Sequence, residues 1–97
     1  MIFADENARR QLLEEGEVVT FRQHAHSEGR DWATNRQRGK KICDIEVKLI
    51  CRVDRFKDLI PYVEKSGFKH IWDWAEAIRK FIGDSEFKGY LYKVTKL

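Results

Sequence analysis

The stretch Cys43–Val53, CDIEVKLICRV, carries the most regular pattern in this sequence. Apolar residues and cysteines fill its odd positions, whereas charged residues fill most of its even positions. Alternation with a period of two is typical of a β-strand that buries one face and leaves the other in water. We therefore predict one long strand, whose buried face is formed by Cys43, Ile45, Val47, Leu49, Cys51 and Val53.

Both cysteines of the chain, Cys43 and Cys51, belong to this predicted strand. The extended chain between them would span roughly 27 Å, which is too far for a disulfide bond. We expect buried, reduced thiols. Their spacing matches no metal-ligand motif, so neither cysteine is a candidate ligand or nucleophile.

Two elements are predicted on the N-terminal side of this strand. Asp5 or Asn7 caps a helix that carries Ala8 and Leu12 on one side and ends at Gly16, a residue that accepts a left-handed backbone. Residues 18–22, VVTFR, then form a short strand. The polar residues 22–41 are expected to form a loop that joins the two strands.

Three elements are predicted on the C-terminal side. A helix that begins near Asp58 keeps Pro61 in its first turn and ends at Gly67. Residues 90–97 are aromatic and β-branched in alternation, which indicates a final strand. Between them, a helix closed by Gly83 has an apolar stripe at steps of three and four residues, formed by Ile71, Trp74, Ala75, Ile78, Phe81 and Ile82.

The order of these elements predicts an α+β fold or a small β-barrel, because it lacks a strict βαβ alternation. A chain of 97 residues forms one domain, residues 1–97, with room for a small pocket and none for a large cofactor fold, so no cofactor is expected. The chain has no long apolar run, and its first residues lack the pattern of a secretory signal. We therefore expect a cytoplasmic protein without a membrane partner.

Positive charge is concentrated in residues 22–41. This stretch holds six basic residues and two acids, a net charge of +4, while the whole chain carries +3. A polyanion would be attracted to this segment before any other surface. The alternatives are a solvated loop with incidental charge and a docking surface for an acidic protein.

One aromatic residue, Trp32, lies within this basic segment. Cations neutralise a phosphate backbone, and a flat ring stacks on an unpaired base, so this composition favours RNA as the partner. The cations around Trp32 are Arg30, Arg36, Arg38, Lys40 and Lys41.

The sequence resembles the ASCH domain family of the PUA-like superfamily. The likeness covers nearly the whole chain in element order, and Gly16, Thr20 and Arg22 match the family's signature of glycine, threonine, one apolar residue and arginine. The resemblance implies a small β-barrel with an N-terminal helix, a two-helix insertion before the last strand and a cleft beside the first strand. It also implies RNA binding or chemistry on modified nucleosides.

The chain departs from the family signature at one catalytic position. Members that act as amidohydrolases use a lysine shortly before the threonine, whereas Glu17 or Val18 stands at this place here. We therefore expect no amidohydrolase turnover of acylated cytidine.

Thr20 and Arg22 are two residues apart on the predicted strand and so share one face. In a cleft, the guanidinium of Arg22 could bind a phosphate or carboxylate, and Thr20 could bind a base edge or a sugar hydroxyl. The alternative is structural: an Arg22 ion pair with a carboxylate such as Glu46, and a threonine that only suits a strand.

His24, His26 and Glu28 alternate and could share one side of an extended segment. They could hold zinc, or one histidine could act as the acid and base of a ribonuclease, or both could simply be solvated. We assign them no metal or catalytic role. The predicted RNA-binding residues are Thr20, Arg22, Arg30, Trp32, Arg36, Arg38, Lys40 and Lys41; the oligomeric state stays open.

Overall fold

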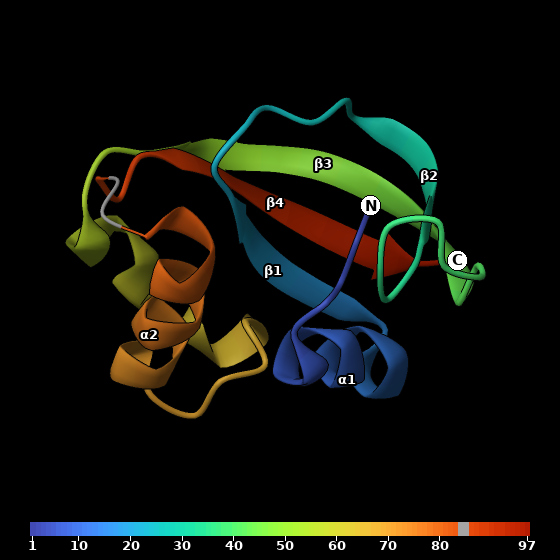
Figure 1. The fold of residues 1–97 in the computed structure, drawn as a ribbon, viewed down its shortest axis with the longest axis horizontal. Coiled ribbons are helices and arrows are strands. Elements are labelled where there is room, and N and C mark those ends of the chain that lie inside the picture. The colour runs from blue at the N-terminus through green and yellow to red at the C-terminus, as the bar shows by residue number, and fades with distance from the viewer. Residues whose placement is uncertain (84–85) are drawn as a thin grey trace.

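The computed structural model describes residues 1–83 and 86–97. It has an α+β architecture with three helices and one four-stranded sheet (Figure 1). The elements follow in the order α1 (Glu6–Glu15), β1 (Glu17–Arg22), β2 (Gly29–Ala33), β3 (Cys43–Val53), the 3₁₀ helix η1 (Phe56–Lys65), α2 (Ile71–Ile82) and β4 (Gly89–Lys96). No helix in the described residues is long and apolar enough to cross a membrane.

The sheet is antiparallel throughout and has the strand order β1-β4-β3-β2. The C-terminal strand β4 therefore lies inside the sheet, between β1 and β3. The edge strands β1 and β2 do not pair with each other, so the expected barrel is not closed. A single parallel bridge, Ile2 to Thr34, attaches the N-terminal segment just beyond the β2 edge.

The predicted single buried face of β3 is wrong, because a register irregularity interrupts the strand between Leu49 and Cys51. Before it, Ile45 and Val47 are buried on one face; after it, Cys51 and Val53 pack against a different group of core residues. An extra residue in one strand turns the following side chains to the other face. The sequence pattern kept its period of two across this point and so concealed the switch.

The thiols are less buried than predicted. Cys43 and Cys51 are both free and only half-buried. They pack against separate core clusters, on the two sides of the irregularity. Burial is still sufficient to raise the pKa of the Cys43 thiol above its usual value.

The basic segment is not a continuous loop, as the sequence had suggested. Residues Gly29–Ala33 form strand β2, which pairs with β3 so that Arg30 lies opposite Glu46 and Trp32 opposite Asp44. Charged residues conceal this strand, since only one of its residues, Ala33, is buried. Cross-strand pairing with β3 overrides the weak strand propensity of this sequence.

Both ends of α1 have the capping residues that the sequence predicted. The Asp5 carboxylate accepts the backbone N–H groups of Asn7 and Ala8, and Gly16 ends the helix with a φ of 81°. The helix predicted from Asp58 differs: it is a 3₁₀ helix that begins at Phe56 and contains Pro61. Asp58 instead caps its start by accepting N–H groups from Asp54 and Arg55.

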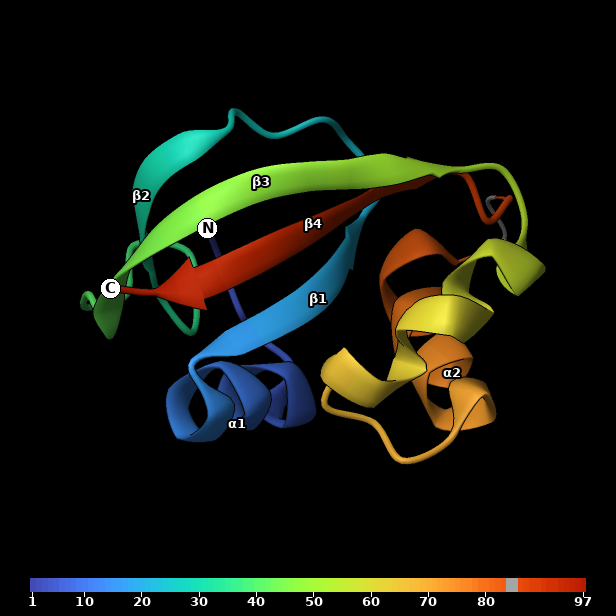
Figure 2. The ribbon, with the colours of Figure 1, turned by 180° about the vertical axis from the view of Figure 1, so that it is seen from behind.

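Two hydrophobic clusters cover the two faces of the sheet. Val18 and its neighbours across β4 and β3, Val94 and Val47, pack with the first cluster, which includes Leu12 of α1. Val19, on the opposite face, packs with the second cluster, which η1 and α2 cover. Figures 1 and 2 show α1 beside β1 near one end of the sheet and η1 with α2 near the other end.

The predicted apolar stripe of α2 is only partly core. Trp74, Ala75, Ile78 and Ile82 are buried, whereas the Phe81 side chain is 68% exposed. An amphipathic stripe about 100° wide can extend past the sheet it covers. Phe81 therefore lies at the edge of the core, where its side chain lines a cavity.

Candidate functional site

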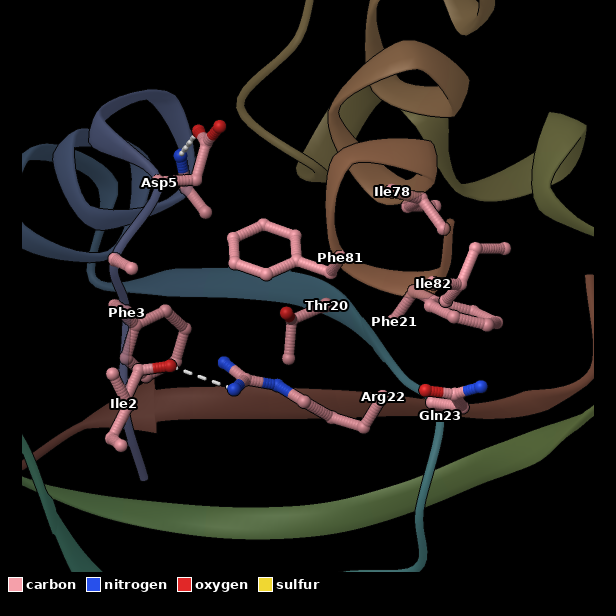
Figure 3. Close-up of a pocket in the computed structure, with 12 residues that line it drawn as sticks. Ile2, Phe3, Asp5, Thr20, Phe21, Arg22, Gln23, Ile78, Phe81 and Ile82 are labelled. Carbon is pink, nitrogen blue, oxygen red and sulfur yellow. Dashed lines mark hydrogen bonds between the residues drawn. The ribbon is translucent and has the colours of Figure 1, made fainter. Parts of the chain in front are cut away.

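A cavity of about 320 Å³ lies where the N-terminal segment, α1, β1 and α2 meet (Figure 3). This volume is at the lower end for small-molecule sites and suits one compact ring system. Most of the lining is apolar, with a few polar side chains, as in typical ligand pockets. The lining residues are Ile2, Phe3, Ala4, Asp5, Ala8, Thr20, Phe21, Arg22, Gln23, Ile78, Phe81 and Ile82.

Thr20 and Arg22, which share one face of β1, both line this cavity, and Phe21 and Gln23 line it as well. Val18, the next residue on the same face, lies under α1 in the first core cluster. This face of β1 therefore packs into the core at Val18 and lines the cavity at Thr20 and Arg22. Strand geometry alone brings the hydroxyl and the guanidinium together.

The guanidinium of Arg22 does not pair with Glu46, so the structural alternative is wrong in that detail. Its Nη1 donates to the carbonyl oxygen of Ile2 at 2.7 Å, and its Cζ lies 4.9 Å from the centre of the Phe3 ring. Nε is buried and has no hydrogen-bond partner within the described residues. Burial lowers the pKa of Arg22 to about 10, which still leaves a cation at neutral pH.

The other predicted RNA-binding residues lie outside the cavity. Trp32 is 57% exposed on β2, and the basic side chains on β2 and in the following loop are also exposed. Lys41 forms an ion pair with Asp44 at 3.1 Å. In the described part of the chain no ion pair is found for Arg30, Arg36, Arg38 or Lys40, so their charges are available to a partner.

The N-terminal segment connects the cavity to this basic region. Ile2 lines the cavity and also bridges Thr34, the residue that precedes the basic loop. The Met1 backbone nitrogen lies 2.9 Å from the Asp31 carboxylate and 2.8 Å from the carbonyl oxygen of Trp32. The wall of the cavity is thus fastened directly to β2.

His24, His26 and Glu28 do not form a common site. His26 lies 3.2 Å from the Asp31 carboxylate, while Glu28 accepts the backbone N–H of Leu49. His24 is exposed. Among residues 1–83 and 86–97, no group of three potential ligands has the geometry for a metal ion.

Glu17 and Val18, which stand where the ASCH signature has a lysine, have structural roles in this chain. Glu17 pairs with Lys65 and Lys93, which keeps the pKa of its carboxyl below the usual value. Val18 is fully buried. Neither residue lines the cavity.

Besides Phe21 on β1, the cavity has two aromatic lining residues, Phe3 and Phe81, that were not predicted as site residues. Phe81 belongs to a helical stripe and so looked like core. Phe3 lies two residues before the Asp5 cap, outside every element that the sequence predicted. Only the fold brings these two rings to Thr20 and Arg22.

Comparison of this chain with protein-family models, with curated proteins and with solved structures finds no match. The ASCH resemblance and any function therefore rest on the chain's own residues. The cavity with its half-buried arginine, and the exposed cations that the N-terminal segment joins to it, are the features that bear on function.

Proposed function

We propose that this chain is a PUA-like domain of the ASCH type that binds single-stranded RNA, without catalysis. One observation carries the proposal: a half-buried arginine, with no anionic partner among the described residues, lines an apolar cavity, and the N-terminal segment joins this cavity to a set of exposed cations. Such a cavity suits an unpaired base. The exposed cations suit the phosphates on either side of it.

The PUA-like architecture is supported by the N-terminal segment. This segment bonds to Thr34 beyond one edge of the sheet and, through the Ile2 carbonyl, to Arg22 on the other edge strand. It therefore spans the gap that separates β1 from β2. In our proposal it replaces direct strand pairing as the closure of a barrel-like sheet.

Two rings could contact bases. Phe81 lies at the cavity with its ring largely exposed, and Trp32 presents its ring on β2. Base stacking tolerates every sequence because each base has a π-face. Hydrogen bonds from Thr20 and Arg22 would then act on the edge of the base that enters the cavity.

The test is a binding titration of short single-stranded RNA at several salt concentrations, with polyglutamate as a second anion. We expect RNA affinity to fall as salt rises but to keep a contribution from stacking. The Arg22→Gln variant should bind RNA clearly more weakly than the parent chain. Arg52→Gln serves as the control, because Arg52 is an exposed arginine outside the cavity. Equal binding of polyglutamate and RNA would refute the proposal and favour an acidic protein partner.

A further inference from the structure

The cavity lies along the free edge of strand β1. This strand is at the edge of the sheet and pairs with β4 on one side. The four consecutive residues 20–23 all line the cavity, although side chains alternate between the two faces of a strand. In Figure 3 the β4 and β3 ribbons run on one side of β1, whereas α1, Phe81 and α2 lie on the other side. The cavity therefore borders the backbone edge of β1 as well as its side chains.

The backbone N–H and C=O groups of Phe21 point away from β4, toward this edge. At the end of the β1–β4 pair, the Lys96 N–H donates to the Gly16 carbonyl oxygen at 2.7 Å. Hydrogen-bonded and non-hydrogen-bonded pairs alternate in an antiparallel ladder, so the even-numbered residues of β1 bond to β4 and the odd-numbered residues point outward. The same alternation explains why Gln11 of α1 can donate to the outward carbonyl oxygen of Glu17.

The outward groups of Phe21 have no protein partner. Neither its N–H nor its C=O forms a hydrogen bond outside the ladder within the described residues. Backbone groups that are partly shielded from water cost free energy when they stay unpaired. This edge therefore favours a ligand that brings one acceptor and one donor side by side.

Only a short piece of the β1 edge is open. Val19, the preceding residue with outward groups, is buried in the second core cluster and lies outside the cavity lining. Gly67, after η1, lies against Asn7 and Gln11 of α1, so the chain meets α1 alongside this part of β1. A peptide that adds to a sheet forms main-chain bonds along a strand, usually of about three to ten residues. The open edge at Phe21 is too short for that, but it suits a single planar ring.

We propose that the Phe21 main chain reads the Watson–Crick edge of one unpaired base in this cavity. This inference rests on the proposed function, because it states how the cavity would hold a base of the bound RNA. Every base has an acceptor beside a donor on this edge: N1 and the amine in adenine, N3 and the amine in cytosine, O6 and N1–H in guanine, and O4 and N3–H in uracil.

In this arrangement the Phe21 N–H donates to the acceptor of the base, and the Phe21 C=O accepts from its donor. The apolar side chains of Phe3, Ile78 and Phe81 line the same cavity and contact the ring. Because all four bases offer the same pair of groups, the cavity distinguishes unpaired from paired bases rather than one base from another.

The test compares oligouridine with two methylated forms of the same length and charge, in titrations of the full chain. A methyl group at N3 removes the donor of the Watson–Crick edge, whereas a methyl group at C5 leaves this edge intact. We expect the N3-methylated RNA to bind about tenfold or more weakly than unmodified oligouridine, because the Phe21 carbonyl oxygen loses its donor. The C5-methylated RNA is the matched control and should bind like oligouridine. The salt dependence should be the same for all of them, since the phosphates are unchanged.

Amide hydrogen exchange assigns the effect to Phe21. In the free chain its amide should exchange faster than the amides of Thr20 and Arg22, which bond to β4. Bound oligouridine should protect the Phe21 amide, and N3-methylated RNA should protect it less. The Thr20→Val variant removes a hydroxyl and keeps a residue that suits a strand, so it should preserve the ratio between the two affinities. Loss of that ratio would show that the Thr20 side chain reads the base and would overturn the inference.

The outcomes separate this inference from the proposed function. Equal binding of N3-methylated and unmodified RNA, or equal losses from both methylations, would overturn the inference and leave RNA binding intact. A preference of about tenfold or more among oligouridine, oligocytidine and oligoadenosine would also overturn it, because side chains would then read the base. Absence of binding to any RNA would refute the proposed function and the inference together. Protection of the Phe21 amide by a blocked Thr-Val-Thr tripeptide, and by no RNA, would assign this edge to strand addition instead.

Discussion

At the scale of single residues, Arg22 links fold and function. Its guanidinium fastens Ile2, contacts the Phe3 ring and lines the cavity. A surface arginine would gain little from such contacts. Here the guanidinium is partly withdrawn from water, which lowers its pKa, and its Nε has no hydrogen-bond partner within the described residues.

Trp32 provides a prediction about stacking. Trp32→Ala should weaken RNA binding by about 1 to 3 kcal/mol and leave the dependence on salt unchanged, because a stacked base releases no counterions. The side chain is 57% exposed, so the melting temperature should hardly change. Affinity titrations at several salt concentrations measure both quantities; an unfolded variant would mean that the ring is part of the core.

Gly67 provides a prediction about stability. A Cβ atom there would clash with the Asn7 carbonyl oxygen of α1, and the backbone φ is +93°. Gly67→Ala should therefore destabilise the fold by at least about 1 kcal/mol more than Gly16→Ala. Gly16 is the matched control, since it also has a positive φ but has nothing within 4 Å of an added methyl group. Urea unfolding of the two variants compares them, and equal stabilities would contradict this close approach of Gly67 to α1.

At the scale of elements, the start of η1 depends on an ionised carboxylate. The Asp54 backbone N–H, followed by that of Arg55, holds the pKa of Asp58 below its usual value. This contribution is present above the unfolded pKa of about 3.9 and is lost as pH falls through the lower folded pKa. Asp58→Asn should thus be less stable than the parent chain at neutral pH. The difference should shrink in acid, and urea titrations that show the same gap at both pH values would refute it.

The loop after β2 should carry the charge component of binding. Replacement of Arg36, Arg38, Lys40 and Lys41 by glutamine should flatten the plot of log affinity against log salt by about 0.7 for each phosphate that the variant no longer neutralises. These side chains are exposed, so folding should survive. Binding should weaken alike on every RNA sequence. An unchanged slope and affinity would exclude this loop as the phosphate-binding surface.

Several elements could be predicted from sequence because their local signals agree with the tertiary structure. α1 has its Asp5 cap and Gly16 exit, and β3 and β4 alternate clearly. β2 was missed, since a strand with a single buried residue has no periodic apolar signal. The irregularity in β3 was missed because cysteine, isoleucine and leucine look apolar on either face.

At the scale of the whole molecule, the candidate site divides into two parts. Thr20 and Arg22 were predictable as a pair from strand alternation, and the structure assigns both to one cavity. Phe3 and Asp5 belong to the N-terminal segment and Phe81 to α2, far along the sequence, so only the packing of α1 and α2 around β1 could reveal them as one lining. The basic residues form a separate, exposed region that the N-terminal segment joins to the cavity.

The central claim is that one strand of RNA contacts both the cavity and the loop after β2. The most direct measurement is the titration of unlabelled single-stranded RNA into the isotope-labelled chain, followed by backbone amide shifts. We predict saturable shifts at Phe3, at residues 20–23, at Phe81 and at residues 35–41, with the η1 amides unmoved. Shifts confined to η1 and the outer face of α2, or no shifts at all, would contradict the claim.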